Sequence, residues 1–366
     1  MAKTRVLVVD DSAFMRKVIC DMIAQDDSLE VVGTARDGLD ALEKIAQLRP
    51  DVVTLDVEMP RKNGLETLRD LMKSQPVPVV MLSSMTQSGA KATIEALALG
   101  AVDFVAKPSG PISLDIEQVQ DELVGKIKAA ALARVQRGMG LRRPLVKAKT
   151  RRPARKITEF SRPAVSGSGT RPRTVLAIGA STGGPRALEA VIRHFPADLP
   201  AGVLVVQHMP AGFTRSMAER LDQLSSIKVK EAENGEHIRA GVVYIAPGDY
   251  HMVVSGDGVI HVEQTSPVNY VRPSVDVTLS SLPSIYSDQL VGVILTGMGK
   301  DGAAGMAKIK AGGGVTIVQD ETTSTIYSMP RAVVENGDAD FILPLDRIGD
   351  AAVRAVKKLQ QRVGKR

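Results

Sequence analysis

Short apolar stretches alternate with longer amphipathic stretches over about the first 130 residues of the chain. Five apolar runs rich in Val and Leu predict buried strands at residues 4–10, 29–35, 51–56, 77–83 and 101–106. Each run is followed by a stretch with helical spacing of its apolar positions. Five strand–helix repeats of this kind predict a parallel sheet with helices on both faces, a (βα)5 domain.

The same alternation resumes at residue 172. Apolar runs at residues 174–180, 202–207, 289–297 and 314–320 predict the core strands of a second α/β domain, doubly wound and mostly parallel. Residues 242–254 and 259–264 are apolar as well, and the sequence SGDG joins them. This pair predicts a β-hairpin inserted into the second domain.

Charge and composition divide the chain between these two domains. The 366 residues carry a net charge of +6, yet residues 134–173 alone hold 13 Lys and Arg with a single acid, Glu159. That segment is rich in Pro, Gly and Ser and has no apolar periodicity, which is typical of a solvated linker. This segment splits the chain into a first unit that ends near residue 135 and a second that starts near residue 172. Our predicted bounds are 4–125 for the first domain, 126–171 for the basic linker and 172–362 for the second domain.

Other features of the composition exclude several classes of protein. No apolar run approaches the roughly 18 residues that span a bilayer, and the sequence MAKTRVLVVDD at the N-terminus shows no signal-peptide h-region. The single cysteine, Cys20, excludes an intramolecular disulfide framework and a multi-cysteine zinc site. The basic segment is a linker and not a compact output domain, so we expect no nucleic-acid partner. These features predict a cytoplasmic protein without membrane insertion.

Polar residues stand at the carboxyl ends of the predicted strands in the first domain: Asp10, Asp11, Asp56, Ser83 and Lys107. In parallel sheets these ends meet at one edge, where ligands bind. Three carboxylates gathered there favour a divalent cation, and oxygen ligands favour Mg²⁺. A carboxylate beside Mg²⁺ can attack a phosphoryl group, while a lysine and a serine hydroxyl contact its oxygens. A single acid after a strand is common; the complete set is specific.

With the motifs VVDDS, TLDVEMPRKNGLE and DFVAKP, residues 4–125 resemble the receiver domain of two-component response regulators. The resemblance implies that Asp56 is the phospho-acceptor and that Asp10 and Asp11 hold Mg²⁺ together with it. It also implies that Lys107 contacts the phosphate and that Phe104 is the switch aromatic. A core position for the Phe104 ring is compatible with that role.

Candidate chemistry in the second domain begins at Ser181. The sequence GASTGG around it satisfies G-x-S-x-G between a strand and a helix, although such a turn binds phosphate equally well. His208 directly follows the apolar run VLVVQ and is the best-placed base for the serine. Asp301, in LTGMGKDGAAG, is the candidate acid to orient that histidine. Its competitors are Asp249, assigned to the start of the hairpin, and Asp276, assigned to the start of a helix.

Four motifs follow the receiver in the order GASTGGP, VVQHMP, NYVRPSVD and LTGMGKDGA. Together they resemble the bacterial chemotaxis protein-glutamate methylesterase (CheB) family. The resemblance implies hydrolysis of glutamate γ-methyl esters on chemoreceptors, with deamidation of glutamines as a second activity. It names the methyl-accepting chemoreceptors as substrate and the chemotaxis histidine kinase CheA as phosphodonor, with no cofactor for the ester reaction.

The same resemblance assigns roles to individual residues. Ser181, His208 and Asp301 become a catalytic triad, while Thr182, Gly183 and Met298 are expected near the oxyanion and substrate pocket. The two-domain layout further predicts that the unphosphorylated receiver covers the Ser181 edge and that phosphorylation of Asp56 releases it. The alternative is a response regulator whose second domain binds a phosphate or a partner without catalysis. Such a module would need neither His208 nor Asp301.

Overall fold

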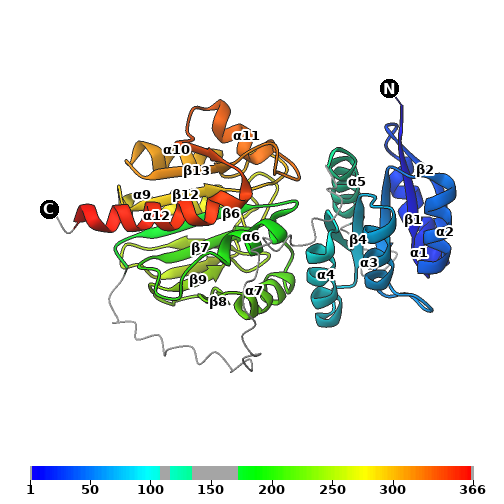
Figure 1. Ribbon diagram of the computed structural model, residues 1–366, viewed down its shortest axis with the longest axis horizontal. Coiled ribbons are helices and arrows are strands. Elements are labelled where there is room, and N and C mark those ends of the chain that lie inside the picture. The colour runs from blue at the N-terminus through cyan, green and yellow to red at the C-terminus, as the bar shows by residue number, and fades with distance from the viewer. Residues whose placement is uncertain (1, 108–115, 134–171, 364–366) are drawn as a thin grey trace, which may run out of the picture.

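The computed structural model describes residues 2–107, 116–133 and 172–363, which form two α/β domains (Figure 1). The first domain consists of β1 (Thr4–Val9), α1 (Ala13–Ala24), β2 (Leu29–Ala35), α2 (Gly38–Leu48), β3 (Val52–Asp56), α3 (Gly64–Ser74), β4 (Val79–Ser83), α4 (Gln87–Leu99), β5 (Asp103–Ala106) and α5 (Ile116–Leu132). Its five strands lie in the order β2-β1-β3-β4-β5 and every recorded pairing is parallel. The predicted (βα)5 architecture is confirmed.

Apolar side chains on both faces of this sheet explain the layering. Val6 and Val8 in β1 belong to the core beneath α1 and α5, whereas Leu7 and Val9 belong to the core beneath α2 and α3. Successive side chains of a strand point to opposite faces, so one continuous apolar run serves both helical layers.

The last helix of the first domain extends beyond the predicted boundary at residue 125. Helix α5 continues to Leu132, because Ile127 and Ala130 are buried against the sheet and the sequence KAAAL favours a helix. The first residues of the predicted linker, 126–132, therefore belong to this helix. Residues 134–171 of that linker lie outside the described ranges.

The second domain is built around a larger sheet. Its elements are β6 (Val175–Ala180), α6 (Gly184–Ile192), β7 (Gly202–Gln207), α7 (Phe213–Leu224), β8 (Lys228–Glu231), β9 (Val242–Ile245), β10 (His251–Val254), β11 (Ile260–Glu263), α8 (Val275–Ser281), α9 (Pro283–Tyr286), β12 (Leu290–Ile294), α10 (Ala303–Ala311), β13 (Val315–Gln319), α11 (Ser328–Glu335), β14 (Phe341–Leu343) and α12 (Leu345–Val363). Seven strands lie in the order β14-β13-β12-β6-β7-β9-β8, and all recorded pairings among them are parallel.

One predicted element differs from the structure. The first half of the expected hairpin, Val242–Ile245, is strand β9 of the main sheet, and only β10 and β11 form an antiparallel pair. All four side chains of β9 are buried, as expected for a central parallel strand. Pro247, Gly248 and Asp249, which has φ +68°, then direct the chain away from the sheet into the hairpin.

The two domains pack through elements that follow β4 and β5 in the first domain and β6 and β7 in the second. Helix α4 packs on α6 and α7, as Figure 1 shows for the facing sides of the domains. The Thr182 hydroxyl donates a hydrogen bond to Asp103 Oδ2 at 2.5 Å, and Lys91 pairs with Glu219 at 3.9 Å. Among the described helices, none has both the length and the hydropathy of a transmembrane segment.

Candidate functional site

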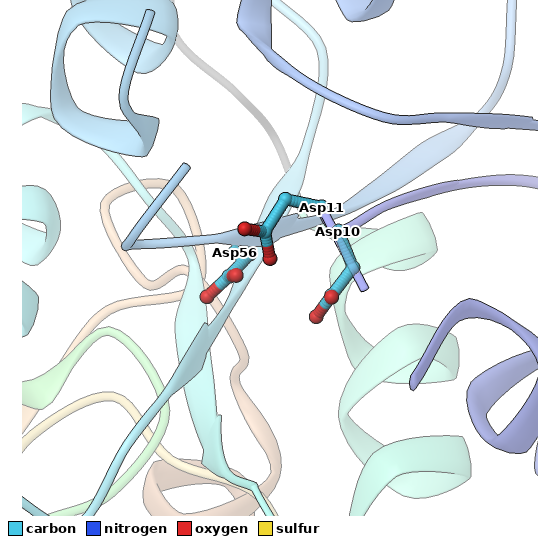
Figure 2. A group of neighbouring side chains, drawn as sticks. All are labelled: Asp10, Asp11 and Asp56. Atoms are coloured by element: carbon cyan, nitrogen blue, oxygen red, sulfur yellow. The ribbon is translucent and has the colours of Figure 1, made fainter. Parts of the chain in front are cut away.

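Three carboxylates converge beyond the carboxyl ends of β1 and β3 (Figure 2). Asp10 and Asp11 directly follow β1 and Asp56 ends β3, and one carboxylate oxygen from each lies within 4.8 Å of the others. Asp10 and Asp56 are buried, whereas Asp11 is exposed. This acidic cluster in the first domain is consistent with a Mg²⁺ site, since hard oxygen ligands with one side open to solvent suit that ion.

Lys107, just after β5, reaches into the same cluster. Its Nζ lies 2.7 Å from Asp10 Oδ2 and 2.7 Å from Asp56 Oδ2. Burial raises the pKa of Asp56 to about 6, with Asp10 adding to the rise and Lys107 opposing it. Burial works to lower the pKa of Lys107, but the two carboxylates outweigh it and raise that pKa. The ammonium group is thus held charged beside Asp56, where it can neutralise an incoming anion.

The predicted residues Ser83 and Phe104 lie in the neighbouring strands β4 and β5. Ser83 ends β4 and is fully buried, with its Oγ 2.7 Å from Thr93 Oγ1. Phe104 in β5 is also buried, and its ring stacks on Phe213 of the second domain at a centroid distance of 4.4 Å. Lys126 donates a hydrogen bond to the Phe104 carbonyl at 2.6 Å. Phe104 is therefore both a buried ring and a contact between the domains.

Ser181 follows β6 at the sharp turn into α6. Its backbone N–H donates to Thr296 O at 3.1 Å, and its carbonyl accepts from Gly184 N at 2.7 Å. Gly183 has φ +76°, and a Cβ on it would overlap the Thr325 side chain. Glycine is required there by both conformation and space, so Gly183 fixes the path of the backbone that presents Ser181.

A buried amide ties Ser181 to His208. Gln207, the last residue of β7, donates through Nε2 to the Ser181 carbonyl at 2.9 Å and to the His208 carbonyl at 3.1 Å. The His208 N–H in turn donates to Ala180 O at 3.1 Å. The backbones of Ser181 and His208 are thereby fixed side by side at the carboxyl ends of adjacent strands. Gln207 had no predicted role. Its only sequence signal is a glutamine at the end of the apolar run VLVVQ, directly before His208.

Asp301 orients the ring of His208. The carboxylate oxygen Oδ2 of Asp301 lies 2.8 Å from His208 Nε2, and the Asp301 side chain is 3% exposed. Burial alone would raise the pKa of Asp301, but hydrogen bonds from His208, Ser274 and the backbone hold it at about 2. Because Asp301 is ionised at neutral pH, His208 Nε2 carries the proton of this bond. The other ring nitrogen, Nδ1, is then the atom able to accept a proton.

Four further donors, from the start of α8 and the loop before it, bind the Asp301 carboxylate. It accepts from Val275 N at 2.6 Å, Ser274 Oγ at 2.8 Å, Asn269 Nδ2 at 3.0 Å and Asp276 N at 3.2 Å. Five donors including His208 therefore converge on one carboxylate. This arrangement stabilises its ionised form and fixes its direction.

The competing acids have other partners. Asp249 Oδ1 pairs with Arg272 Nη2 at 2.6 Å beside the hairpin, as its predicted place implied. Asp276 lies in the first turn of α8, where its Oδ1 accepts from Gly305 N at 2.7 Å. Burial raises the pKa of Asp276, with Asp301 contributing. Of the three acids considered, Asp301 is the one in contact with His208.

The residues that support Asp301 had no predicted role. Asn269 and Ser274 both lie in the motif NYVRPSVD, which was singled out without a function for either. His251 is fully buried, accepts from Ser274 N at its Nδ1 and donates from Nε2 to Ser266 O, each at 3.1 Å. Both ring nitrogens of His251 are thus bound within the domain, which gives this histidine a structural role. The signal for Ser274 was its place before a helix, since serine is a favoured N-cap.

Thr182 and Met298 lie in the segments that follow β6 and β12. Thr182 is buried under the first domain by its hydrogen bond to Asp103, and its carbonyl accepts from Thr296 Oγ1 at 3.0 Å. Met298, in the loop after β12, is 48% exposed. A side chain at Gly125 in α5 would begin 3.7 Å from Met298 Cε, so this loop also meets the first domain.

Comparisons with known proteins match both halves of the chain. Residues 6–117 match the family described as response regulator receiver domain, and residues 176–352 match CheB methylesterase. The chain is 56% identical over 353 residues to a protein-glutamate methylesterase/protein-glutamine glutaminase of Symbiobacterium thermophilum, covering 96% of this chain and 97% of the relative. A protein of the same description from Pyrococcus abyssi is 49% identical over 361 residues, covering 98% and 95%. The crystal structure of the Thermotoga maritima CheB methylesterase catalytic domain is similar with 45% identity, coverage of 50% and 97%, and a TM-score of 0.48.

Proposed function

Because this chain belongs to the CheB methylesterase family and carries a response-regulator receiver domain, we propose that Ser181, His208 and Asp301 hydrolyse glutamate γ-methyl esters on chemoreceptors. The protein is a protein-glutamate methylesterase/protein-glutamine glutaminase. Its proposed substrates are methyl-accepting chemoreceptors, whose cytoplasmic helices place the reaction in the cytoplasm. The proposed division is a receiver followed by a linker and a catalytic domain from residue 172.

In the proposed mechanism the Ser181 hydroxyl attacks the γ-carbonyl carbon of the ester. His208 accepts the hydroxyl proton at its free ring nitrogen, and Asp301 balances the positive imidazolium that results. Collapse of the tetrahedral intermediate expels methanol, which takes the proton from His208 and leaves an acyl-serine. Water then attacks the acyl-serine with His208 again as base, and glutamate and free Ser181 are regenerated. With glutamine as substrate, ammonia leaves in place of methanol.

The developing oxyanion needs donors near Ser181. We assign this role to the turn that contains Thr182 and Gly183, because Gly183 is the N-cap of α6 and the first backbone N–H groups of a helix point outward. Met298 is assigned to the edge of the substrate pocket. Its exposed thioether lies in the loop that leads to Asp301.

The observation that carries this proposal is the 2.8 Å contact between His208 and Asp301, one strand away from Ser181. A phosphate-binding module needs basic groups and free amides, not an ionised carboxylate behind a histidine. The converging donors on Asp301 would have no purpose there. This favours hydrolysis over the non-catalytic alternative.

For the receiver we propose that Asp56 accepts a phosphoryl group from the chemotaxis histidine kinase CheA. Asp10, Asp11 and Asp56 would hold Mg²⁺, whose charge would neutralise the phosphoryl oxygens when it is bound. An Asp56 oxygen forms the new bond to phosphorus as the donor leaves with its electron pair. Lys107, already 2.7 Å from Asp56, pairs with the added negative charge, and Ser83 is assigned to a phosphate oxygen.

We further propose that the unphosphorylated receiver blocks the approach to Ser181. Support comes from the hydrogen bond between Asp103 and Thr182, which adjoins the nucleophile, and from the stacking of Phe104 on Phe213. Both receiver residues lie in β5, and Lys107 directly follows that strand. Phosphorylation that moves β5 would therefore act on the contacts that hold the domains together.

Methanol release from radiolabelled methylated receptor tests the receiver's role. Addition of a small phosphodonor with Mg²⁺ should raise the rate for the wild type severalfold, because phosphorylation shifts the population toward the open form. Asp56→Asn should keep the basal rate and lose the response. A response that persists in Asp56→Asn would contradict the assignment of Asp56.

Phe104→Ala tests the block itself. Loss of the stacked pair should weaken docking by about 1 kcal/mol and raise basal methanol release about fivefold without phosphodonor. Lys91→Ala is the matched control, because its exposed ion pair with Glu219 at 3.9 Å is expected to contribute little. A chain that begins at Pro172 gives the upper limit; if it is no more active than the unphosphorylated whole, simple occlusion is wrong.

A further inference from the structure

A two-residue turn lies directly against the Asp301 cluster. Val268 and Val271 exchange two backbone hydrogen bonds of 3.1 Å, and the residues between them, Asn269 and Tyr270, have φ of +53° and +64°. Positive φ at both central positions is the geometry that favours Asn-Gly in such turns. Tyr270 therefore occupies a position where glycine would be unstrained and where a bulky side chain costs free energy.

The rest of this loop is held firmly. The Asn269 side chain donates to Asp301 at 3.0 Å and to Asp276 at 3.2 Å. Arg272 donates to the Thr265 carbonyl at 2.6 Å and to Asp249 at 2.6 Å. The turn is thus anchored on both sides of its tip, and these bonds fix the backbone that carries Tyr270.

The fold gains nothing visible from the tyrosine itself. Its side chain is 102% exposed, the highest value among the exposed large hydrophobic residues of the described chain. The receiver, docked over Thr182 and Phe213, leaves this ring uncovered. A strained and rigidly presented aromatic without intramolecular packing calls for a role outside the folded chain.

We propose that Tyr270 is a contact for the protein substrate: its ring packs on the receptor helix that carries the glutamyl ester, close to the bond being hydrolysed. This rests on the proposed function and adds a residue that determines specificity for a protein over a small ester. Tyrosine suits the task, since it offers a large contact area, loses few rotamers on binding and keeps its hydroxyl in water. Asn269, the residue before Tyr270, donates a hydrogen bond to Asp301 and so connects this contact to the site.

The test compares Tyr270→Gly, Tyr270→Phe and the wild type, all phosphorylated, on methylated receptor in membranes and on N-acetylglutamate γ-methyl ester. Tyr270→Gly should raise the melting temperature of the catalytic domain by about 2–4 °C, because the strain is relieved. It should also lower kcat/KM for the receptor about tenfold through KM, while kcat/KM for the small ester stays within about twofold. Tyr270→Phe should keep most of the activity on the receptor.

The control is Phe341→Ala, which removes a 51% exposed aromatic from edge strand β14 and should leave both substrates unaffected. An unchanged kcat/KM of Tyr270→Gly for the receptor overturns the proposal. So does an equal loss on both substrates, which would show that Tyr270 acts through Asn269 on the triad.

Co-sedimentation with receptor membranes separates this inference from the proposed function. In a Ser181→Ala background, which leaves the ester intact, Tyr270→Gly should weaken binding to the membranes about tenfold. If the wild type released no methanol, or if Ser181→Ala still released it, the proposed catalysis would be contradicted. The binding comparison would still decide the role of Tyr270.

Discussion

Ser181→Ala is expected to reduce methanol release from methylated receptor by about 10⁴-fold or more, with and without phosphodonor. Without the hydroxyl no acyl-serine forms, so deamidation should fail with ester hydrolysis. KM should change little, because the alanine occupies the same turn between Gly183 and the Thr296 carbonyl. The measurement is release of labelled methanol, together with receptor binding to show that the variant still engages its substrate.

Two comparisons sharpen this result. Ser255→Ala, which removes a hydroxyl from the turn between β10 and β11, should keep full activity. Adding His208→Gln to Ser181→Ala should cost nothing further, since a base has no function without its nucleophile. Equal release from Ser181→Ala and the wild type would show that Ser181 is not the nucleophile and would favour direct attack by water.

Much of the fold follows from apolar patterning. Runs such as VLVV in β1 and VLVV in β7 are buried on both faces, which is the sequence signature of a parallel sheet. The predicted bounds of these two strands agree with the structure to within one residue, whereas the run at 289–297 extends three residues beyond β12. Edge strands were harder to predict from the sequence. Strand β8 reads KVKE and pairs on one side only, so charge appears where a central strand would be apolar. Strand β14 has three residues, too few for periodicity to show.

The site was predictable where its residues end strands. Asp10, Asp56, Ser181 and His208 each follow or end an apolar run, so the pattern alone places each of them at the ligand-binding edge of its sheet. The supports of Asp301 were not predictable in this way. Asn269, Ser274 and Val275 reach the carboxylate through a loop and a helix start, and backbone N–H donors carry no mark in a sequence.

Contacts between the domains were likewise hidden. Phe104 stacks on Phe213, and Asp103 accepts from Thr182, which lies 79 residues further along the chain. Nothing in the apolar pattern of either domain marks these side chains as contacts with the other domain. Separation of the domains would expose apolar side chains, because the buried core of the first domain continues across this contact into that of the second.

Asp301→Asn is expected to lower kcat by about 10⁴-fold, the scale found when a triad aspartate becomes asparagine. An amide cannot balance the imidazolium of His208. Whichever way it is turned, its NH₂ group also meets donors, since Oδ2 faces His208 and Val275 N while Oδ1 faces Ser274, Asn269 and Asp276 N. Asp276→Asn is the matched control, because it removes a neighbouring charge and leaves the contact of Asp301 with His208 in place.

The pH dependence of stability gives this assignment a second test. The pKa of Asp301 is lowered from 3.8 to about 2 in the folded protein, so the ionised carboxylate stabilises the fold above pH 4 by about 2 kcal/mol. That contribution is lost as the pH falls toward 2. The difference in unfolding free energy between the wild type and Asp301→Asn should therefore be largest near neutral pH and shrink on acidification. A difference that is constant from pH 6 to pH 2 would mean that the variant acts through packing and that the charge of Asp301 contributes little to the fold.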